Sequence, residues 1–302
     1  MRRLLIPVTT ALLCITGAGL ASAAVGPKTV HRPAALLAPH SVPVPSPPAS
    51  IADDQPVVVN QAAVTARVKQ ATQAVVPEAQ IGFEVFDRTT GSVLASENAD
   101  QPMASMSVVK LLIALDVLAR DNWAAPDPGT QQQLHQMLAN SDDQIANDLW
   151  TAGGGPAIVT RMASLLRLTG TRPPDDPGEW GDTMITPQDM VTVYRYVTDQ
   201  LPKNNQDLIL GALSGVTKVA ADGFDQYFGI PDGMPNTSWA VKQGWGTSGS
   251  QAVMNSTGLV GPGWRYAVVV LAAAPANSYA TLPAAVTAAA GALADLVHPT
   301  LS

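Results

Sequence analysis

Two residues with complementary chemistry stand three positions apart in Ser107-Val108-Val109-Lys110. On a helix, side chains at this spacing lie on one face, so the lysine amine can reach the serine hydroxyl. A serine becomes a strong nucleophile when a neighbouring base removes its proton. Apolar surroundings and the positive end of the helix dipole both lower a lysine pKa. The pair predicts a covalent active site; the alternative is a serine that caps a buried helix and a lysine that extends to solvent.

A second hydroxyl follows in Ser141-Asp142-Asp143. Taken alone, this tripeptide is typical of a helix N-cap with acidic residues in the first turn. Beside an activated serine, the Ser141 hydroxyl can relay a proton to a leaving group, and Asp143 can contact the substrate. Both interpretations stay open from the sequence.

A cationic segment, Lys242-Gln243-Gly244-Trp245, ends a predicted strand. A lysine on a strand that lines a cleft can bind a substrate carboxylate as a point charge. Gly244 allows substrate to approach the backbone closely, and the backbone N–H groups of Trp245 and Ser107 can form an oxyanion hole. Gln243 is a further candidate for substrate binding. The alternative is an edge-strand lysine that discourages aggregation.

In this order, the three segments resemble the S-x-x-K, S-D-N and K-T-G motifs of class A β-lactamases and penicillin-binding serine hydrolases. The resemblance extends over about 61–297. It implies that Ser107 is the acylated nucleophile and Lys110 its base or proton relay. It also implies that Ser141 is the proton shuttle and that Lys242 faces a substrate carboxylate.

The sequence departs from the family pattern at three places. Asp143 stands where the family has asparagine, and an ionised aspartate accepts hydrogen bonds but cannot donate them. Gln243 replaces the threonine of K-T-G, which removes a compact hydroxyl. The loop 172–182 lacks the E-x-x-L-N segment whose glutamate orients the deacylating water in efficient β-lactamases. Because this segment is missing, slow hydrolysis of the acyl-enzyme is expected. Glu179 is the only glutamate of this loop and the candidate loop acid.

The elements that position these residues are of two kinds. Apolar alternation predicts a strand at 81–86, and the turn at 89–91 predicts a hairpin with a second strand at 92–97. Further strands are predicted at 239–244, 252–259 and 266–272. The segment 106–213 between them is largely helical, with further helices predicted at 58–76 and 284–297. We therefore expect an α/β (α+β) protein of the β-lactamase/transpeptidase-like type. One antiparallel sheet is built from both chain ends and flanked by helices, and a helical subdomain is inserted between the ends.

The N-terminus has the pattern of a secretion signal. Arg2 and Arg3 precede an apolar stretch, and Ala21-Ser22-Ala23 provides a cleavage site. An uncleaved membrane anchor is the alternative. The segment 24–56 is rich in proline and alanine and is expected to form an extended, disordered tether. The β-lactamase-like domain is then expected at 57–299.

Composition narrows the classes of partner. The net charge of −7 offers no positive surface for nucleic acid or anionic lipid. Cys14 is the single cysteine, and Leu13 before it does not fit a lipid-anchor site, so neither a disulfide nor a lipoprotein is predicted. The histidines are isolated, so no metal site is expected, and no cofactor is needed. No stretch after the signal is long and apolar enough to span a membrane.

Together these expectations describe a secreted serine hydrolase, periplasmic or associated with the cell wall. Ser107 is acylated by a β-lactam or by a related cyclic or peptide amide or ester. The expected partner is a small-molecule β-lactam or a peptidoglycan stem peptide, and the protein is expected to be a monomer. Two alternatives stay open: a D-alanyl-D-alanine carboxypeptidase-like enzyme, and a catalytically weak or inactive peptidoglycan-binding protein of the envelope.

Overall fold

The computed structural model of the chain describes residues 60–297. These residues fall within one compact unit, Pro56–Ser302. The expected signal peptide at 1–23 and the expected tether at 24–56 lie outside the described residues, as does Cys14. None of the described helices is both long and apolar enough to cross a bilayer.

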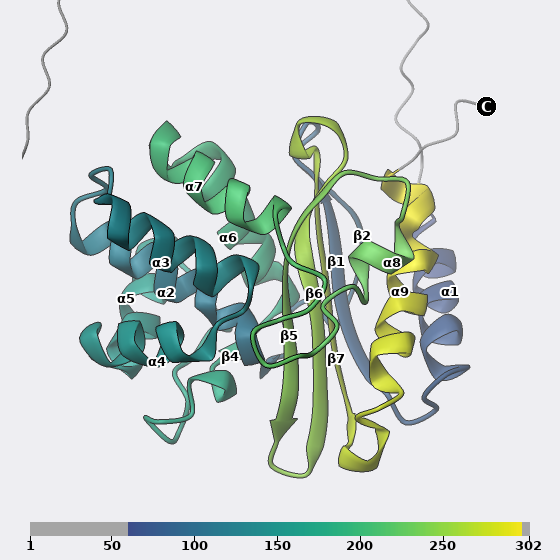
Figure 1. Cartoon of the computed structure of the whole chain (residues 1–302). Coiled ribbons are helices and arrows are strands. Elements are labelled where there is room, and N and C mark those ends of the chain that lie inside the picture. The colour runs from purple at the N-terminus through teal and green to yellow at the C-terminus, as the bar shows by residue number, and fades with distance from the viewer. Residues whose placement is uncertain (1–59, 298–302) are drawn as a thin grey trace, which may run out of the picture. The chain divides into compact units, whose positions relative to one another are not determined.

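A five-stranded antiparallel sheet lies at the centre of this unit, in the order β2-β1-β7-β6-β5 (Figure 1). The strands are β1 (Gln80–Asp87), β2 (Ser92–Glu97), β5 (Trp239–Ser248), β6 (Gln251–Val260) and β7 (Tyr266–Pro275). β1 pairs with β7 along its whole length, from Gln80 opposite Ala273 to Asp87 opposite Tyr266. This pairing confirms the prediction of one sheet built from both chain ends. β5 is an edge strand and is longer than the predicted 239–244, because its pairing with β6 continues to Ser248.

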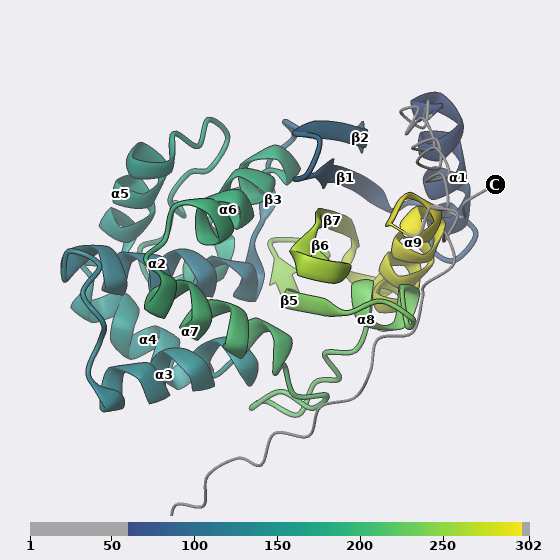
Figure 2. The same cartoon turned by 90° about the horizontal axis from the view of Figure 1, so that it is seen from above.

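Helices cover both faces of the sheet (Figure 2). α1 (Gln61–Gln73) and α9 (Leu282–Val297) pack together on one face, and α6 (Pro187–Asp199) lies on the other. β7 is apolar along its length because its successive side chains point to opposite faces of the sheet and both faces are covered by helices. Val268 and Val270 enter the core beneath α1 and α9, whereas Val269 and Leu271 enter the core on the helical side.

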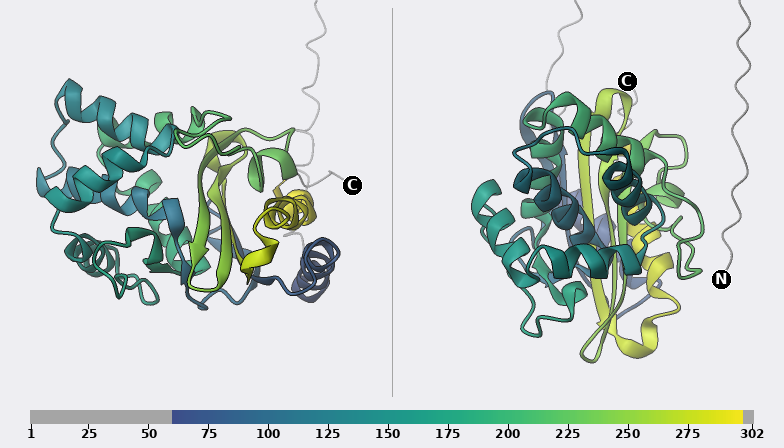
Figure 3. Two further views of the ribbon diagram at one scale, coloured as in Figure 1. Left: turned by 60° about the horizontal axis from the view of Figure 1, so that its bottom comes forward. Right: turned by 60° about the vertical axis from the view of Figure 1, so that its left-hand side comes forward.

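The remaining helices form the inserted helical part that the sequence predicts (Figure 3). They are α2 (Lys110–Arg120), α3 (Pro128–Ala139), α4 (Asp143–Ala152), α5 (Pro156–Leu166) and α7 (Lys203–Ser214). Shorter elements are β3 (Met103–Ala104), β4 (Met184–Ile185), α8 (Ile230–Gly233) and the 3₁₀ turns η1 (Met106–Val109), η2 (Trp180–Asp182), η3 (Pro262–Trp264) and η4 (Ala276–Ser278). The sequence did not predict the β3–β4 pair, because two residues per strand are too few to show alternation.

A buried ion pair anchors α2, the helix that begins at Lys110. The Asp116 carboxylate is fully buried and accepts two hydrogen bonds from Arg161 of α5, at 2.8 and 2.9 Å. Arg120 adds a third at 2.9 Å. Because two guanidinium groups neutralise the carboxylate, its burial is tolerated. The pair ties α2 to α5 and so fixes the helix that presents the serine–lysine pair.

Candidate active site

Ser107 lies in η1, which leads directly into α2. The Lys110 ammonium donates to Ser107 Oγ at 2.8 Å, and the two residues are only 5% and 0% exposed. Met106, directly before the serine, has φ +48°. This left-handed backbone costs a non-glycine residue about 1 kcal/mol or more, and it persists only where the surroundings impose it. The pair predicted from the sequence is therefore in hydrogen-bond contact on a constrained turn.

The edge strand β5 holds this turn in place. A Cβ on Gly244 would lie 2.5 Å from the Ser105 carbonyl oxygen, so only glycine permits this approach. From β6, the Asn255 side-chain amide donates to the carbonyls of Ala104 and Ser105 at 2.9 and 3.0 Å. Gly244, a predicted substrate contact, is thus in the structure a site of close packing between the sheet and the nucleophile turn.

Lys110 has more acceptors around it than its three N–H donors can serve equally. Besides Ser107, it donates to the Ser141 carbonyl oxygen at 2.8 Å, to Ser141 Oγ at 3.2 Å and to Asp143 Oδ1 at 2.5 Å. Burial lowers the pKa of Lys110, and the Asp143 carboxylate opposes this by stabilising the charged form. The net result is a pKa below that of an exposed lysine, so the neutral amine is more accessible than usual.

Ser141 connects the two lysines that the sequence singled out. Its Oγ contacts Lys110 Nζ and also accepts a hydrogen bond from Lys242 Nζ at 3.0 Å. The backbone of Ser141 is left-handed, with φ +55°. Lys242 is fully buried; burial sets its pKa well below the usual value, and the charge of Lys110 adds to this effect. Ser107, Lys110, Ser141 and Lys242 therefore form one continuous hydrogen-bonded chain.

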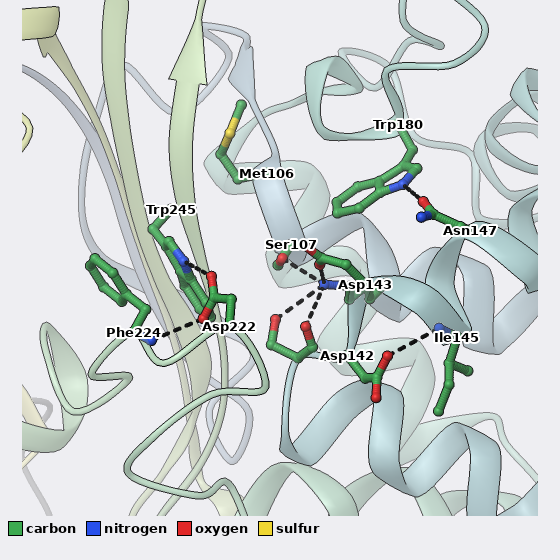
Figure 4. Close-up of polar contacts among 12 residues, drawn as sticks. Met106, Ser107, Asp142, Asp143, Ile145, Asn147, Trp180, Asp222, Phe224 and Trp245 are labelled. Atoms are coloured by element: carbon green, nitrogen blue, oxygen red, sulfur yellow. Dashed lines mark hydrogen bonds and ion pairs between the residues drawn. The ribbon is translucent and has the colours of Figure 1, made fainter.

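Asp142 performs the capping role that the sequence left open for this tripeptide. Its Oδ1 accepts from the Ile145 backbone N–H at 3.1 Å (Figure 4), and its Oδ2 accepts from Gln136 at 2.8 Å. The Ser141 hydroxyl is thereby left to the two lysines. Asp143 begins α4, with 56% of its side chain exposed, and lines the pocket in front of Ser107.

The Gln243 side chain is used within the protein rather than in the pocket. It is fully buried, and its Nε2 donates to the carbonyls of Gln226 and Phe228 at 3.1 and 2.5 Å. These bonds tie β5 to the segment that precedes α8. The departure from K-T-G at this position therefore has a structural reason.

The Gln243→Thr variant introduces the threonine of the K-T-G motif. It is expected to lower the free energy of unfolding by about 2 kcal/mol, because two buried carbonyls lose their donor. Urea unfolding measures this change. Gln251→Thr is the matched control, since Gln251 is exposed on the neighbouring strand. A Gln243→Thr variant within about 0.5 kcal/mol of the unmodified protein would contradict this account.

Two tryptophans stand on opposite sides of Ser107 (Figure 4). Trp245 stacks on Phe224 with ring centroids 4.8 Å apart, and its Nε1 donates to Asp222 Oδ2 at 2.9 Å. Trp180 donates from Nε1 to Asn147 at 2.8 Å, and its ring lies 4.8 Å from Lys110 Nζ. The indoles are thus held by hydrogen bonds as two walls.

Between these walls lies a pocket of about 510 Å³, with Ser107 in its lining. Glu179 also lines the pocket, but no hydrogen bond joins it to Ser107 or Lys110 in the described part of the chain. Sequence reasoning did not single out Trp180 or Asp222. Trp180 lies in the loop 172–182, where Glu179 was the only candidate residue, and Asp222 is in a loop with no motif. Within residues 60–297, no group of three or more His, Cys, Asp or Glu side chains is placed to hold a metal ion.

The sheet order, the inserted helices and the serine–lysine turn at the sheet edge define a β-lactamase-like protein. Solved structures share this fold. A β-lactamase from Xanthomonas campestris superposes with a TM-score of 0.63 at 20% identity, over 80% of this chain and 100% of that one. PBP-A gives a TM-score of 0.61 at 17% identity, over 78% of this chain and 97% of that one. The β-lactamase of Streptomyces albus G gives 0.60 at 21% identity, over 78% and 99% of the two chains.

Sequence relatives place the chain more narrowly. It belongs to the family of the mycobacterial protein named "Putative lipoprotein LppW". The LppW proteins of Mycobacterium tuberculosis H37Rv and Mycobacterium bovis are each 37% identical to it over 230 residues, which is 74% of this chain and 72% of the relative. No family model matches the sequence.

Proposed function

We propose that this protein is a serine acyl hydrolase in which Ser107 is acylated by a β-lactam or by a related amide or ester. The observation that carries the proposal is the 2.8 Å hydrogen bond from Lys110 Nζ to Ser107 Oγ beside the pocket. A serine nucleophile requires an adjacent base, and a buried lysine with a lowered pKa can serve as one.

Acylation then follows from the hydrogen-bonded chain. The neutral Lys110 amine accepts the hydroxyl proton while Ser107 Oγ bonds to the substrate carbonyl carbon. The carbonyl oxygen becomes an oxyanion, for which we propose the backbone N–H groups of Ser107 and Trp245 as donors. On collapse, the bond to the leaving nitrogen or oxygen breaks. Ser141, held at 3.0 Å by Lys242, passes the proton from Lys110 to that atom.

Deacylation is the slower half of the proposed reaction. Hydrolysis needs a base to take a proton from water as the water attacks the Ser107 ester. Glu179 has no hydrogen bond to Ser107 or Lys110 in the described part of the chain, and we propose Lys110 as the base for this step as well. The acyl-enzyme is therefore expected to accumulate.

The cell envelope is the proposed location. The secretion pattern at 1–23 and the spacer-like composition of 24–56 support export and a separate domain at 57–299. The lipoprotein name of the relatives supports the same compartment. A PBP-A variant is known as an acyl-enzyme with penicillin G, which supports a β-lactam or a peptidoglycan stem peptide as acyl donor here. A D-alanyl-D-alanine carboxypeptidase-like reaction uses the same steps, and the protein is proposed to act as a monomer.

One observation favours a second function. Asp143 Oδ1 lies 2.5 Å from Lys110 Nζ, and this ion pair stabilises the ammonium form, which cannot accept a proton. A peptidoglycan-binding envelope protein that keeps the fold without the chemistry is therefore the second candidate.

Intact mass spectrometry after incubation with a fluorescent penicillin and with 4-nitrophenyl acetate distinguishes the two candidates. We expect an adduct of one acyl group with at least one probe, and none in Ser107→Ala. If neither probe gives an adduct or turnover, and Ser107→Ala binds peptidoglycan as well as the unmodified protein, the binding function replaces the hydrolase.

A further inference from the structure

The pocket in front of Ser107 is lined by acidic side chains. Four carboxylates line it, and no arginine, lysine or histidine does. The four are Asp143, Glu179, Asp182 and Asp222. Asp143, Glu179 and Asp222 are exposed residues. Asp143 is paired with Lys110, so Glu179 and Asp222 supply most of the negative charge that an incoming ligand meets.

The positive charges nearest the pocket are not available to a ligand. Lys110 and Lys242 are both 0% exposed and donate to groups of the protein. Burial lowers the pKa of both lysines, and the Lys110 amine is already paired with the Asp143 carboxylate. Lys242, which the resemblance assigns to a substrate carboxylate, donates instead to Ser141 Oγ and to the Gln243 carbonyl oxygen, each at 3.0 Å. A ligand carboxylate would therefore meet repulsion without a compensating cation.

Aromatic rings complete the lining. Trp180, Trp245 and Tyr279 line the same pocket. Both indoles are fixed by hydrogen bonds to polar neighbours, at 2.8 Å for Trp180 and 2.9 Å for Trp245. Electron-rich ring faces beside carboxylates form the surroundings that ammonium groups prefer. The protein itself shows this, since Lys110 Nζ and Lys242 Nζ lie 4.8 and 5.8 Å from the Trp180 and Trp245 ring centroids. A quaternary or primary amine is attracted by both, whereas a carboxylate is attracted by neither.

We infer that this site prefers acyl donors that carry a positive charge over donors that carry a carboxylate. This inference rests on the proposed acylation of Ser107, because it names the class of donor for that same pocket. The ligand class is an ester or amide whose acyl part bears an ammonium group. The carboxylates and indoles bind this group while the carbonyl carbon meets Ser107.

Three 4-nitrophenyl esters of nearly equal size test the inference. They are the esters of 4-(trimethylammonio)butanoate, of its uncharged isostere 5,5-dimethylhexanoate, and of glutarate, which leaves one free carboxylate. We expect the cationic ester to acylate Ser107 about tenfold faster than the isostere, and the anionic ester to react about tenfold more slowly than it. Raising the salt concentration is expected to reduce only the differences that charge causes.

Variants identify the carboxylates responsible. In the double variant Glu179→Gln/Asp222→Asn, the advantage of the cationic ester is expected to fall below about threefold. Asp225→Asn is the matched control. It removes one charge from the same loop as Asp222, and Asp225 pairs with Lys218 outside the pocket lining. Equal rates for the three esters would overturn the inference while leaving the proposed acylation intact.

If no ester acylates the protein, a binding measurement tests the preference of the pocket for a cation separately from the proposed acylation of Ser107. Calorimetry on Ser107→Ala compares 4-(trimethylammonio)butanamide with 5,5-dimethylhexanamide, neither of which needs the nucleophile. Tighter binding of the cation would support the charge preference although acylation had failed. No preference would overturn both.

Discussion

Replacing Lys110 by methionine is expected to slow acylation of Ser107 by about a thousandfold, which is the scale of a general-base contribution. Methionine has a similar length and no basic nitrogen, so Ser107 loses its proton acceptor while the buried volume is kept. Stopped-flow release of 4-nitrophenolate from 4-nitrophenyl acetate measures the rate.

The Lys110→Met variant is expected to stay folded. Loss of the Lys110 ammonium group leaves no buried charge unpaired, because the Asp143 side chain is 56% exposed. The pKa of Lys110 is lower folded than unfolded, so the unmodified protein gains stability as the pH rises from that lowered value towards about 10.4. The variant is expected to show a smaller rise, which comes from Lys242, whose pKa burial also lowers. Lys203→Met is the control, since Lys203 is exposed and pairs with Asp207 on α7. Acylation by Lys110→Met within about threefold of the unmodified rate would contradict the role of Lys110 as base.

Replacing Asp143 by asparagine is expected to speed acylation at pH 7 by about tenfold. The Asp143 carboxylate raises the pKa of Lys110 through its charge and its hydrogen bond, in opposition to burial. Its removal lowers the Lys110 pKa further. The neutral fraction of the amine at pH 7 therefore grows about tenfold for each unit that the pKa falls. The rate rises with pH through this pKa, so its midpoint is expected to move to lower pH.

Asparagine is also the residue of the β-lactamase S-D-N motif at this position. Two further variants distinguish the loss of the Asp143 charge from a new contact between asparagine and the substrate. Asp143→Ala removes the charge without adding a donor, so it should show the same shift of the pH–rate profile. Asp148→Asn, on the exposed side of the same helix, should show none. A gain in Asp143→Asn alone would indicate a new contact to the substrate, and unchanged profiles in both Asp143 variants would refute the ion-pair account.

The fold was largely predictable from the sequence because each long strand contains a short apolar segment, alternating in β1 and continuous in β7. The sequence predicts that strands from both chain ends share one sheet, and the structure shows that β1 and β7 are the strands that join them. The extension of β5 to Ser248 was not predictable, since Gly244 and Gly246 interrupt the apolar pattern within the strand. The β3–β4 pair was too short to leave a pattern.

The site was predictable where residues lie in fixed local spacing and not where they come from distant loops. Ser107 and Lys110 meet because a helical turn brings them together. The orientation of Gln243 depends on the carbonyls of Gln226 and Phe228, which no local spacing reveals. Asp222 reaches the pocket through its hydrogen bond with Trp245, so its position depends on how two segments pack. Pairings of this kind arise from tertiary structure alone.

The most direct test of the nucleophile is a peptide map after treatment with a small uncharged fluorophosphonate at neutral pH. An activated serine displaces fluoride and keeps the phosphonyl group. We predict one modified peptide, the one that contains Ser107, and its loss in the Lys110→Met variant. A folded protein that stays unmodified, or that is modified at another serine, would contradict the assignment of Ser107 as the nucleophile.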